Sequence, residues 1–93
     1  MTILIADDDP TSRRILEAVL DKWGYDVLTA RDGHQALEKI RCHPELEMAI
    51  LDWVMPGMDG VQVCRKIRQE STPDPIYIIL LTARGSKQDI VAG

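Results

Sequence analysis

Three carboxylates directly follow two short apolar runs, and they are the residues whose type and spacing could support chemistry. Ile3–Ala6 leads into Asp7 and Asp8, and Met48–Leu51 leads into Asp52. Both runs are typical of buried strands, and in an open parallel α/β sheet the working crevice lies outside the carboxyl ends of the strands. Acids gathered there repel one another unless a cation neutralises them, and such oxygen ligands suit a hard ion such as Mg²⁺. The sequence therefore predicts a small acidic metal site.

Strand-like and helix-like segments alternate along the chain, and these elements must position the acids. Strands are expected at Ile3–Ala6, Tyr25–Ala30, Met48–Leu51 and Ile76–Leu81. Helices are expected after the N-cap residues Asp9, Asp32 and Asp59, and a fourth helix is expected to begin within Lys87–Ala92. Four strands alternating with helices predict an α/β fold built on a doubly wound parallel sheet.

The first expected helix has an apolar face at helical spacing. This face consists of Ile15, Leu16, Val19, Leu20 and Trp23, and Gly24 is a natural stop after it. We expect the whole face to be buried, with Trp23 in the core at the end of the helix.

Length and composition limit the function classes. The chain has 93 residues, of which 45% are hydrophobic, and its net charge of −4 argues against a nucleic-acid surface. Its basic residues are scattered, and the pair Arg13 and Arg14 is expected on a solvated helix face. No run approaches the ~20 apolar residues of a membrane helix, and the start does not resemble a signal peptide. We expect a cytoplasmic protein with no membrane contact, in which Cys42 and Cys64 are free thiols.

The fourth expected strand brings further polar groups to the same edge of the sheet. It ends in Thr82 and Ala83, which offer a hydroxyl and a backbone N–H. Two acids can hold Mg²⁺ and the third can accept a phosphoryl group, while the metal neutralises the charge that develops. The hydroxyl and the N–H can hold the remaining phosphoryl oxygens.

These residues resemble those of the receiver domain of bacterial two-component response regulators. The matching segments are Ile3–Asp8, Ile50–Gly60 and Leu80–Ala83, and the middle one, with its acid followed by Met-Pro-x-Met-Asp-Gly, is the most specific. The resemblance covers the whole chain, so residues 1–93 are expected to form one receiver domain with a flavodoxin-like fold.

The resemblance implies a role for each matching residue. Asp52 resembles the acceptor that takes a phosphoryl group from a sensor histidine kinase or a phosphotransfer protein. Asp7 and Asp8 resemble the acidic pair that binds Mg²⁺ together with Asp52, and Asp8 resembles a direct ligand. The backbone carbonyl of Val54 is implied as a further ligand.

The resemblance also implies a switch. Thr82 resembles the switch hydroxyl, and Val54 and Ala83 occupy positions that influence the lifetime of the phosphoryl group. Such a domain is a phospho-accepting switch read by an output domain or partner, and at most it phosphorylates itself from small donors and dephosphorylates itself. Apolar Val54 cannot orient an attacking water, so we expect a phosphoryl group that is not unusually short-lived.

One departure concerns the C-terminal part. The family has five strand–helix units, whereas this sequence matches four strands and three to four helices. The fifth strand, the last helix and the phosphate-pairing lysine of the family have no counterpart here. Lys87 follows the fourth expected strand, which is the wrong place for that lysine. We therefore expect the fourth strand to be an exposed edge with unpaired backbone groups, beside bared apolar surface. A homodimer formed through that edge, or by exchange of elements, would cover it.

Two other functions are open on the sequence. A phosphorylation-independent, dimerising interaction module would keep its oligomeric state and partner binding in an Asp52→Asn variant. A phosphatase of the haloacid-dehalogenase type would use Asp7 as nucleophile in the motif Asp7-x-Asp9-x-Thr11, although Pro10 and the immediate helix leave little room for the loop of that family. The acid that becomes phosphorylated, Asp52 or Asp7, distinguishes a receiver from such a phosphatase.

Overall fold

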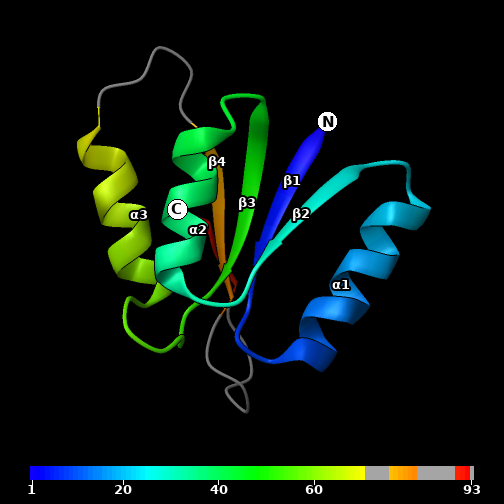
Figure 1. Cartoon of the computed structure of the whole chain (residues 1–93), viewed down its shortest axis with the longest axis horizontal. Helices are drawn as coiled ribbons and strands as arrows, with labels where there is room; N and C mark the ends of the chain where they lie inside the picture. Colours follow the sequence, from blue (N-terminus) through cyan, green and yellow to red (C-terminus); the bar gives the residue numbers. More distant parts are fainter. Residues whose placement is uncertain (71–75, 82–89, 93) are drawn as a thin grey trace.

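A computed structural model describes residues 1–70, 76–81 and 90–92 of the chain, and strands alternate with helices along most of it (Figure 1). The elements are β1 (Thr2–Ala6), α1 (Pro10–Lys22), β2 (Asp26–Ala30), α2 (Gly33–Cys42), β3 (Leu46–Asp52), α3 (Gly60–Gln69), β4 (Tyr77–Leu81) and β5 (Ile90–Ala92). The expected α/β fold is confirmed, with boundaries that differ by a few residues from those expected.

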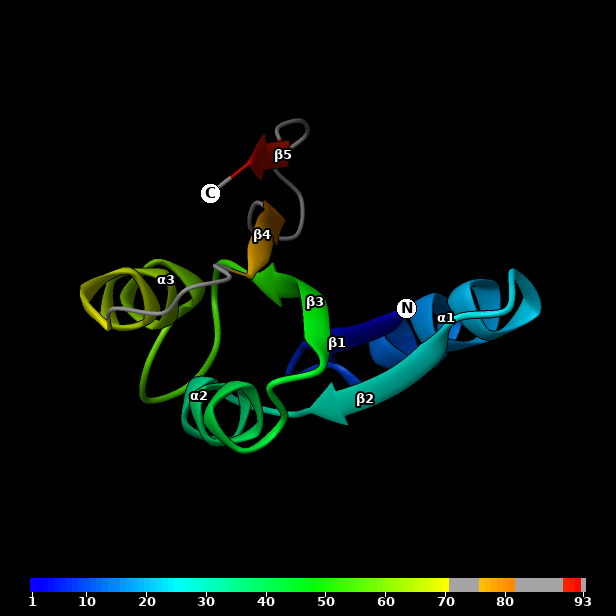
Figure 2. The same cartoon turned by 90° about the horizontal axis from the view of Figure 1, so that it is seen from above.

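The sheet has the strand order β2-β1-β3-β4-β5. Strands β2, β1, β3 and β4 are parallel, so the carboxyl ends of β1 and β3 come to the same edge. Figure 2 shows α2 and α3 on one face of the sheet and α1 on the other. This arrangement is the doubly wound sheet that the sequence predicts.

The three expected N-caps are confirmed. Asp9 accepts a hydrogen bond from the N–H of Thr11, and Pro10 occupies the first turn of α1. Asp32 accepts from Gln35 at the start of α2, and Asp59 forms a reciprocal capping box at the start of α3. These side chains satisfy backbone donors that have no partner within the helix, so they set where each helix begins.

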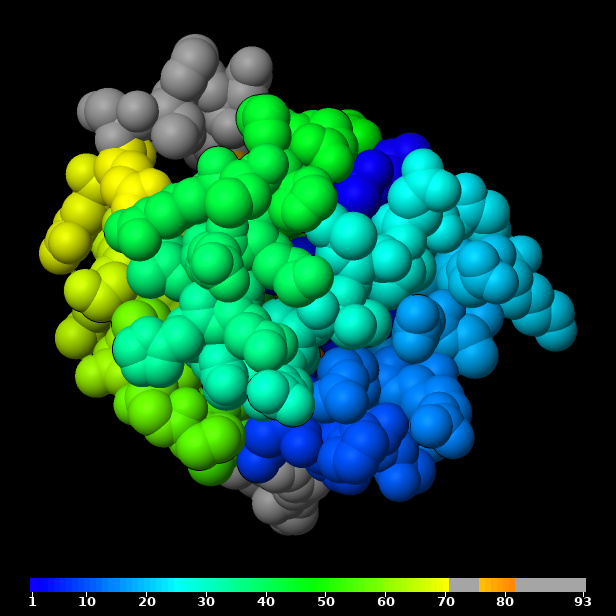
Figure 3. Space-filling model, viewed as in Figure 1, coloured from blue at the N-terminus to red at the C-terminus, as the bar shows by residue number. Residues whose placement is uncertain are grey.

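The larger hydrophobic core lies between the sheet and the pair α2 and α3. It contains Leu4, Leu51, Val63 and Ile78, each fully buried, together with the loop residue Met55. From this side α2 and α3 form much of the surface in front of the sheet (Figure 3). Apolar side chains along each strand point alternately to the two faces of the sheet, as the two-residue period of a strand requires.

The opposite face is covered far less completely, and here one expectation is wrong. A smaller cluster of Ile3, Ile5 and Leu20 packs under α1. Trp23, expected in the core, is 68% exposed. Ile15 is 59% exposed and Val19 is 40% exposed, so only part of the predicted apolar face of α1 contacts the sheet. The pattern shows correctly that α1 is amphipathic, but periodicity alone does not show how wide a stripe the sheet can cover.

The C-terminal region also differs from the expectation. Residues Ile90–Ala92, predicted to lie in a fourth helix, form β5, which pairs antiparallel with β4. The register places Leu81 opposite Ile90 and Ile79 opposite Ala92. The carboxyl half of β4 is therefore not the exposed edge that the sequence predicts, because β5 provides partners for its backbone groups.

The structure also bears on the helices and the cysteines of the chain. None of the helices in the described part of the chain is both long and apolar enough to cross a membrane. Cys42 and Cys64 are free thiols, as expected.

Candidate functional site

Three carboxylates meet at the carboxyl edge of the sheet. Oxygen atoms of Asp7, Asp8 and Asp52 all lie within 4.8 Å of one another. Asp7 is 4% exposed and Asp52 is 3% exposed, whereas Asp8 is more open to solvent. The three acids singled out in the sequence therefore form one cluster, because β1 and β3 are parallel neighbours that end at the same level.

The turn after β1 fixes Asp7 in place. Its N–H donates to the carbonyl of Ala30 at the end of β2 (3.1 Å), and its Oδ1 accepts from the N–H of Asp9 (2.9 Å). The same Asp9 caps α1, so one short turn holds the acid and starts the helix. These bonds orient the Asp7 carboxylate without using a flexible loop.

Arg13 is a site residue that the sequence reasoning missed. Its Nη1 donates to the backbone carbonyl of Asp7 (2.7 Å), so the guanidinium lies beside the acidic cluster. A positive charge at this position reduces the repulsion among the carboxylates. The signal was available in the sequence, since Arg13 lies one helical turn beyond the cap residue Asp9, but the adjacent pair with Arg14 suggested a solvated face.

The segment after β3 fixes Asp52 through its backbone. The N–H of Trp53 donates to the carbonyl of Leu81 at the end of β4 (2.8 Å), and the carbonyl of Trp53 accepts from the N–H of Gly60 at the start of α3 (3.0 Å). A longer contact of 3.4 Å joins the N–H of Val54 to Oδ1 of Asp52. The acid thus sits where β3, β4 and α3 converge.

Two close approaches of the backbone to glycine shape the loop around the cluster. A Cβ on Gly60 would lie 2.6 Å from the carbonyl oxygen of Asp52, and a Cβ on Gly33 would overlap the carbonyl oxygen of Met58. The side chains of Met55 and Met58 are buried in the core and anchor this loop. Glycine at these two positions lets α3 and α2 pack directly against the acidic loop.

The donor set of the cluster suits a hard divalent cation. Carboxylate oxygens are the ligands of Mg²⁺, which is commonly bound by one or two carboxylates and completes its octahedral shell with water. Two carboxylates drawn from a set this compact can bind such an ion directly, and water can bridge it to the third. Without a cation, two buried acids beside a third are costly.

Other residues predicted for the site lie outside the described part of the chain. These are Thr82 and Ala83, and also Lys87, which was excluded from a phosphate-binding role. Val54 lies next to the cluster and is 51% exposed, while its carbonyl remains a predicted ligand. Trp53, adjacent to Asp52, is partly exposed.

The fold and the cluster define a class of protein: a small, doubly wound α/β domain with a compact acidic site at the carboxyl edge of its sheet. The family model described as "Response regulator receiver domain" matches residues 3–93. The chain belongs to the response regulator receiver domain family, as the motifs predict.

Curated relatives agree with this assignment. The chain is 38% identical over 92 residues to chemotaxis protein CheY1 of Helicobacter pylori (strain ATCC 700392 / 26695), covering 98% of this chain and 74% of that protein. It is 50% identical over 92 residues to the probable transcriptional regulator ycf27 of Galdieria sulphuraria, covering 98% of this chain and 34% of that protein. The chain therefore spans about three quarters of the first relative and about one third of the second.

Solved structures show the same fold. The receiver domain of the Francisella response regulator 1452 superposes with a TM-score of 0.80 at 29% identity, covering 92% of this chain and 69% of that one. A CheY-like receiver domain protein from Methanospirillum hungatei JF-1 superposes with a TM-score of 0.79 at 30% identity, covering 94% of this chain and 68% of that one.

Proposed function

We propose that this chain is a phospho-accepting signalling switch in which Asp52 receives a phosphoryl group from a histidine kinase or a phosphotransfer protein. The observation that carries the proposal is the cluster of Asp7, Asp8 and Asp52, with oxygens within 4.8 Å of one another, at the carboxyl edge of a receiver-family sheet. The acids lie on two rigid strands, so their relative positions are set before any ligand arrives.

In the proposed reaction a carboxylate oxygen of Asp52 attacks the phosphorus atom, and the bond from phosphorus to the histidine nitrogen of the donor breaks. The leaving nitrogen keeps the electron pair, and Asp52 becomes an acyl phosphate. Mg²⁺, held by Asp7, Asp8 and Asp52 with the Val54 carbonyl, would neutralise charge on the transferring group.

The residues of this chain have separate tasks in that proposal. The backbone bonds of Trp53 orient Asp52, and those of Asp7 orient its carboxylate. Arg13 holds the turn after β1 by donating to the backbone carbonyl of Asp7. Thr82 and Ala83 keep their predicted roles as switch hydroxyl and as a determinant of phosphoryl lifetime. The output domain or partner that reads the switch, and a cytoplasmic location, likewise stay predictions from the sequence.

The contacts around Asp7 favour this proposal over a phosphatase of the haloacid-dehalogenase type. Oδ1 of Asp7 accepts from Asp9, and α1 begins at Pro10 directly afterwards. An attacking carboxylate needs a free approach to phosphorus, which this tight turn restricts. Asp52 ends its strand at the loop that begins with partly exposed Trp53.

The test is the mass of the intact protein after incubation with a small phosphodonor such as acetyl phosphate, with and without Mg²⁺. We expect a Mg²⁺-dependent gain of one phosphoryl group that is absent from an Asp52→Asn variant. Reduction of the acyl phosphate with borohydride, followed by peptide mapping, identifies the modified acid. Modification of Asp7, or no gain in a folded sample, would contradict the proposal.

A further inference from the structure

One residue, Arg13, closes the turn between β1 and α1 at both of its ends. The N–H of Arg13 donates to the carbonyl of Asp9 (3.0 Å), which is the first backbone bond of α1. The Nη1 atom of the same residue donates to the carbonyl of Asp7 (2.7 Å). The side chain of Arg13 therefore ties the start of the helix to the residue that follows β1.

The carbonyl of Asp7 needs this partner because the sheet ends beside it. The N–H of Asp7 still donates to the carbonyl of Ala30, the last residue of β2. The next donor along β2 in a parallel ladder would be the N–H of Asp32, but Asp32 is already the N-cap of α2. Arg13 supplies a donor to this carbonyl instead, and a hydrogen bond from a charged group is stronger than one between neutral groups.

The peptide group that Arg13 holds joins two of the clustered acids. The carbonyl of Asp7 belongs to the planar unit between Asp7 and Asp8, so its direction also sets the direction in which the backbone presents the Asp8 side chain. The Asp7 carboxylate is fixed separately, because its Oδ1 accepts from the N–H of Asp9 (2.9 Å). Arg13 therefore acts on the relative positions of the Asp7 and Asp8 carboxylates, which share the cluster with Asp52.

Arg13 has two effects of opposite sign on a cation at the cluster. Its positive charge repels the cation, so loss of the charge alone would strengthen the binding of a divalent ion. Its hydrogen bond holds the acids in place, so loss of the bond would weaken binding, because the ligands must then be ordered when the ion arrives. Groups that orient metal ligands in this way typically change metal affinity by about 10–100-fold.

A comparison of Mg²⁺ with Ca²⁺ separates the two effects. Both ions carry two positive charges, so a purely electrostatic effect of Arg13 would change the affinity for both equally. Mg²⁺ demands a near-ideal octahedral shell, whereas Ca²⁺ accepts a larger and more flexible one. A looser turn is therefore expected to weaken the binding of Mg²⁺ more than the binding of Ca²⁺.

We infer that Arg13 is a positioning residue that sets the affinity of the acidic cluster for Mg²⁺ and its preference for Mg²⁺ over Ca²⁺. The inference rests on the proposed function, to which the Mg²⁺ site belongs. Its charge is the smaller effect, because the side chain is only partly buried and water and salt screen its repulsion of the ion. The bond to Asp7 acts at a distance of 2.7 Å and is not screened in this way.

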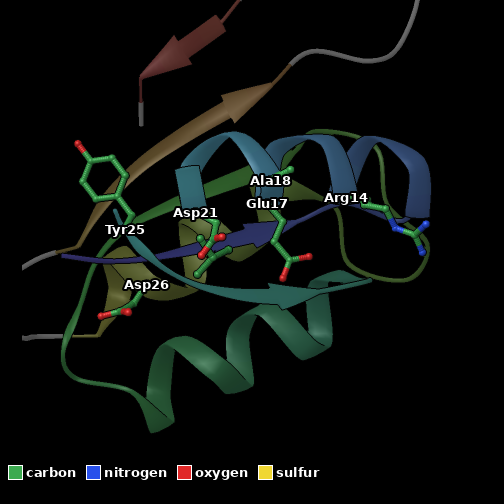
Figure 4. Close-up of a pocket in the computed structure, with 7 residues that line it drawn as sticks. Arg14, Glu17, Ala18, Asp21, Tyr25 and Asp26 are labelled. Atoms are coloured by element: carbon green, nitrogen blue, oxygen red, sulfur yellow. The ribbon is translucent and has the colours of Figure 1, made fainter. Parts of the chain in front are cut away.

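Arg14 is the matched control for Arg13. Successive helix residues are separated by ~100°, so Arg14 projects from another side of α1, and it is exposed. It lines a hollow of about 400 Å³ between α1 and β2, where Figure 4 shows it together with Glu17 and Asp21. Replacing Arg14 by methionine therefore changes the net charge as Arg13→Met does, and leaves the bond from Arg13 to Asp7 in place.

The test is the dissociation constant for Mg²⁺ and for Ca²⁺, obtained from NMR titrations that follow the backbone amides of Asp7, Asp8 and Asp52 with each ion alone. Arg13→Met should bind Mg²⁺ about tenfold more weakly than the parent, with a smaller loss for Ca²⁺. Arg13→Lys keeps the charge and a donor, so it should recover part of the affinity for Mg²⁺. Arg14→Met should match the parent for both ions.

Circular dichroism checks that each variant is folded, and Arg13→Gln, whose shorter side chain removes the charge and the bond, is used if Arg13→Met is not. Equal or tighter binding of Mg²⁺ by the Arg13 variant would overturn the inference, as would an equal loss for the two ions or the same loss in Arg14→Met. A folded parent that binds neither ion would contradict the proposed metal site as well. The two failures can be distinguished, because the parent chain alone decides whether the metal site exists.

Discussion

Replacing Asp8 by asparagine should stabilise the metal-free protein, because the substitution removes one charge from the acidic cluster while keeping its shape. The oxygens of the three acids lie within 4.8 Å of one another. Two unit charges at that distance repel by roughly 3.5 kcal/mol at an effective dielectric constant of about 20. Asp8 is the most open of the three, so solvent and salt screen its share, and we expect Asp8→Asn to raise the free energy of unfolding by about 1–2 kcal/mol.

The measurement is urea unfolding followed by far-ultraviolet circular dichroism, in EDTA and again in excess Mg²⁺. A cation that binds the native state alone stabilises it by about 2.7 kcal/mol at a hundred times its dissociation constant. The parent should gain this stability, whereas Asp8→Asn, with a weakened site, should gain much less. The difference in free energy of unfolding between Asp8→Asn and the parent is therefore expected to shrink or change sign when Mg²⁺ is added.

Glu38→Gln is the control, since it changes the net charge equally at an exposed position of α2, away from the cluster. It should leave the free energy of unfolding nearly unchanged in both buffers. If Asp8→Asn were neutral or destabilising in EDTA, or if Glu38→Gln were stabilising by the same amount, repulsion within the cluster could not be the cause.

Three further predictions concern the elements that hold the site. Gly33→Ala should lower the free energy of unfolding by about 2–3 kcal/mol, because its Cβ would overlap the carbonyl oxygen of Met58; urea unfolding measures this, and a neutral effect would contradict the close approach. Asp59→Ala removes the α3 cap and should cost about 1 kcal/mol, whereas Asp59→Asn should recover most of the loss in the same assay. The pKa of the Glu45 carboxyl is lowered from 4.5 by a backbone hydrogen bond and then by contact with His43. His43→Ala should therefore raise this pKa in an NMR titration, and an unchanged value would rule out the contact. Since the folded-state pKa is lowered, its small stabilising effect is present above pH 4.5 and is lost as the pH falls through the folded-state value.

Local sequence signals predict the acidic cluster and the helix starts because each depends on neighbouring residues. Asp9, Asp32 and Asp59 cap helices by bonding to N–H groups two or three residues away. The meeting of Asp7 with Asp52 needs only the rule that parallel strands end at one edge of a sheet. Arg13 was missed because its partner is a backbone carbonyl, and because the adjacent pair with Arg14 suggested a solvated face although Arg13 lies one helical turn beyond the cap residue Asp9.

Long-range packing accounts for the errors. The spacing of Ile15, Val19 and Trp23 shows an apolar stripe, but which surface covers it depends on elements far away in the chain. The pairing of β5 with β4 is likewise a contact between distant segments, and it places Ile90–Ala92 in a strand. Ile90 and Val91 are β-branched and suit a strand, although a short segment of this kind is ambiguous by pattern alone.

The two tryptophans of the chain stand at opposite ends of the sheet. Trp53 follows Asp52 at the carboxyl edge, whereas Trp23 is the C-cap of α1, a helix of 13 residues that is about 20 Å long. Replacing either tryptophan by phenylalanine leaves a protein with a single fluorescent tryptophan. Fluorescence from Trp53 then reports what reaches the acidic cluster, and fluorescence from Trp23, which is 68% exposed, reports the state of the far end of α1. The chain thus contains two intrinsic probes with which the arrival of a cation at the cluster and the unfolding of the distant end of α1 can be timed separately in the same kind of mixing experiment.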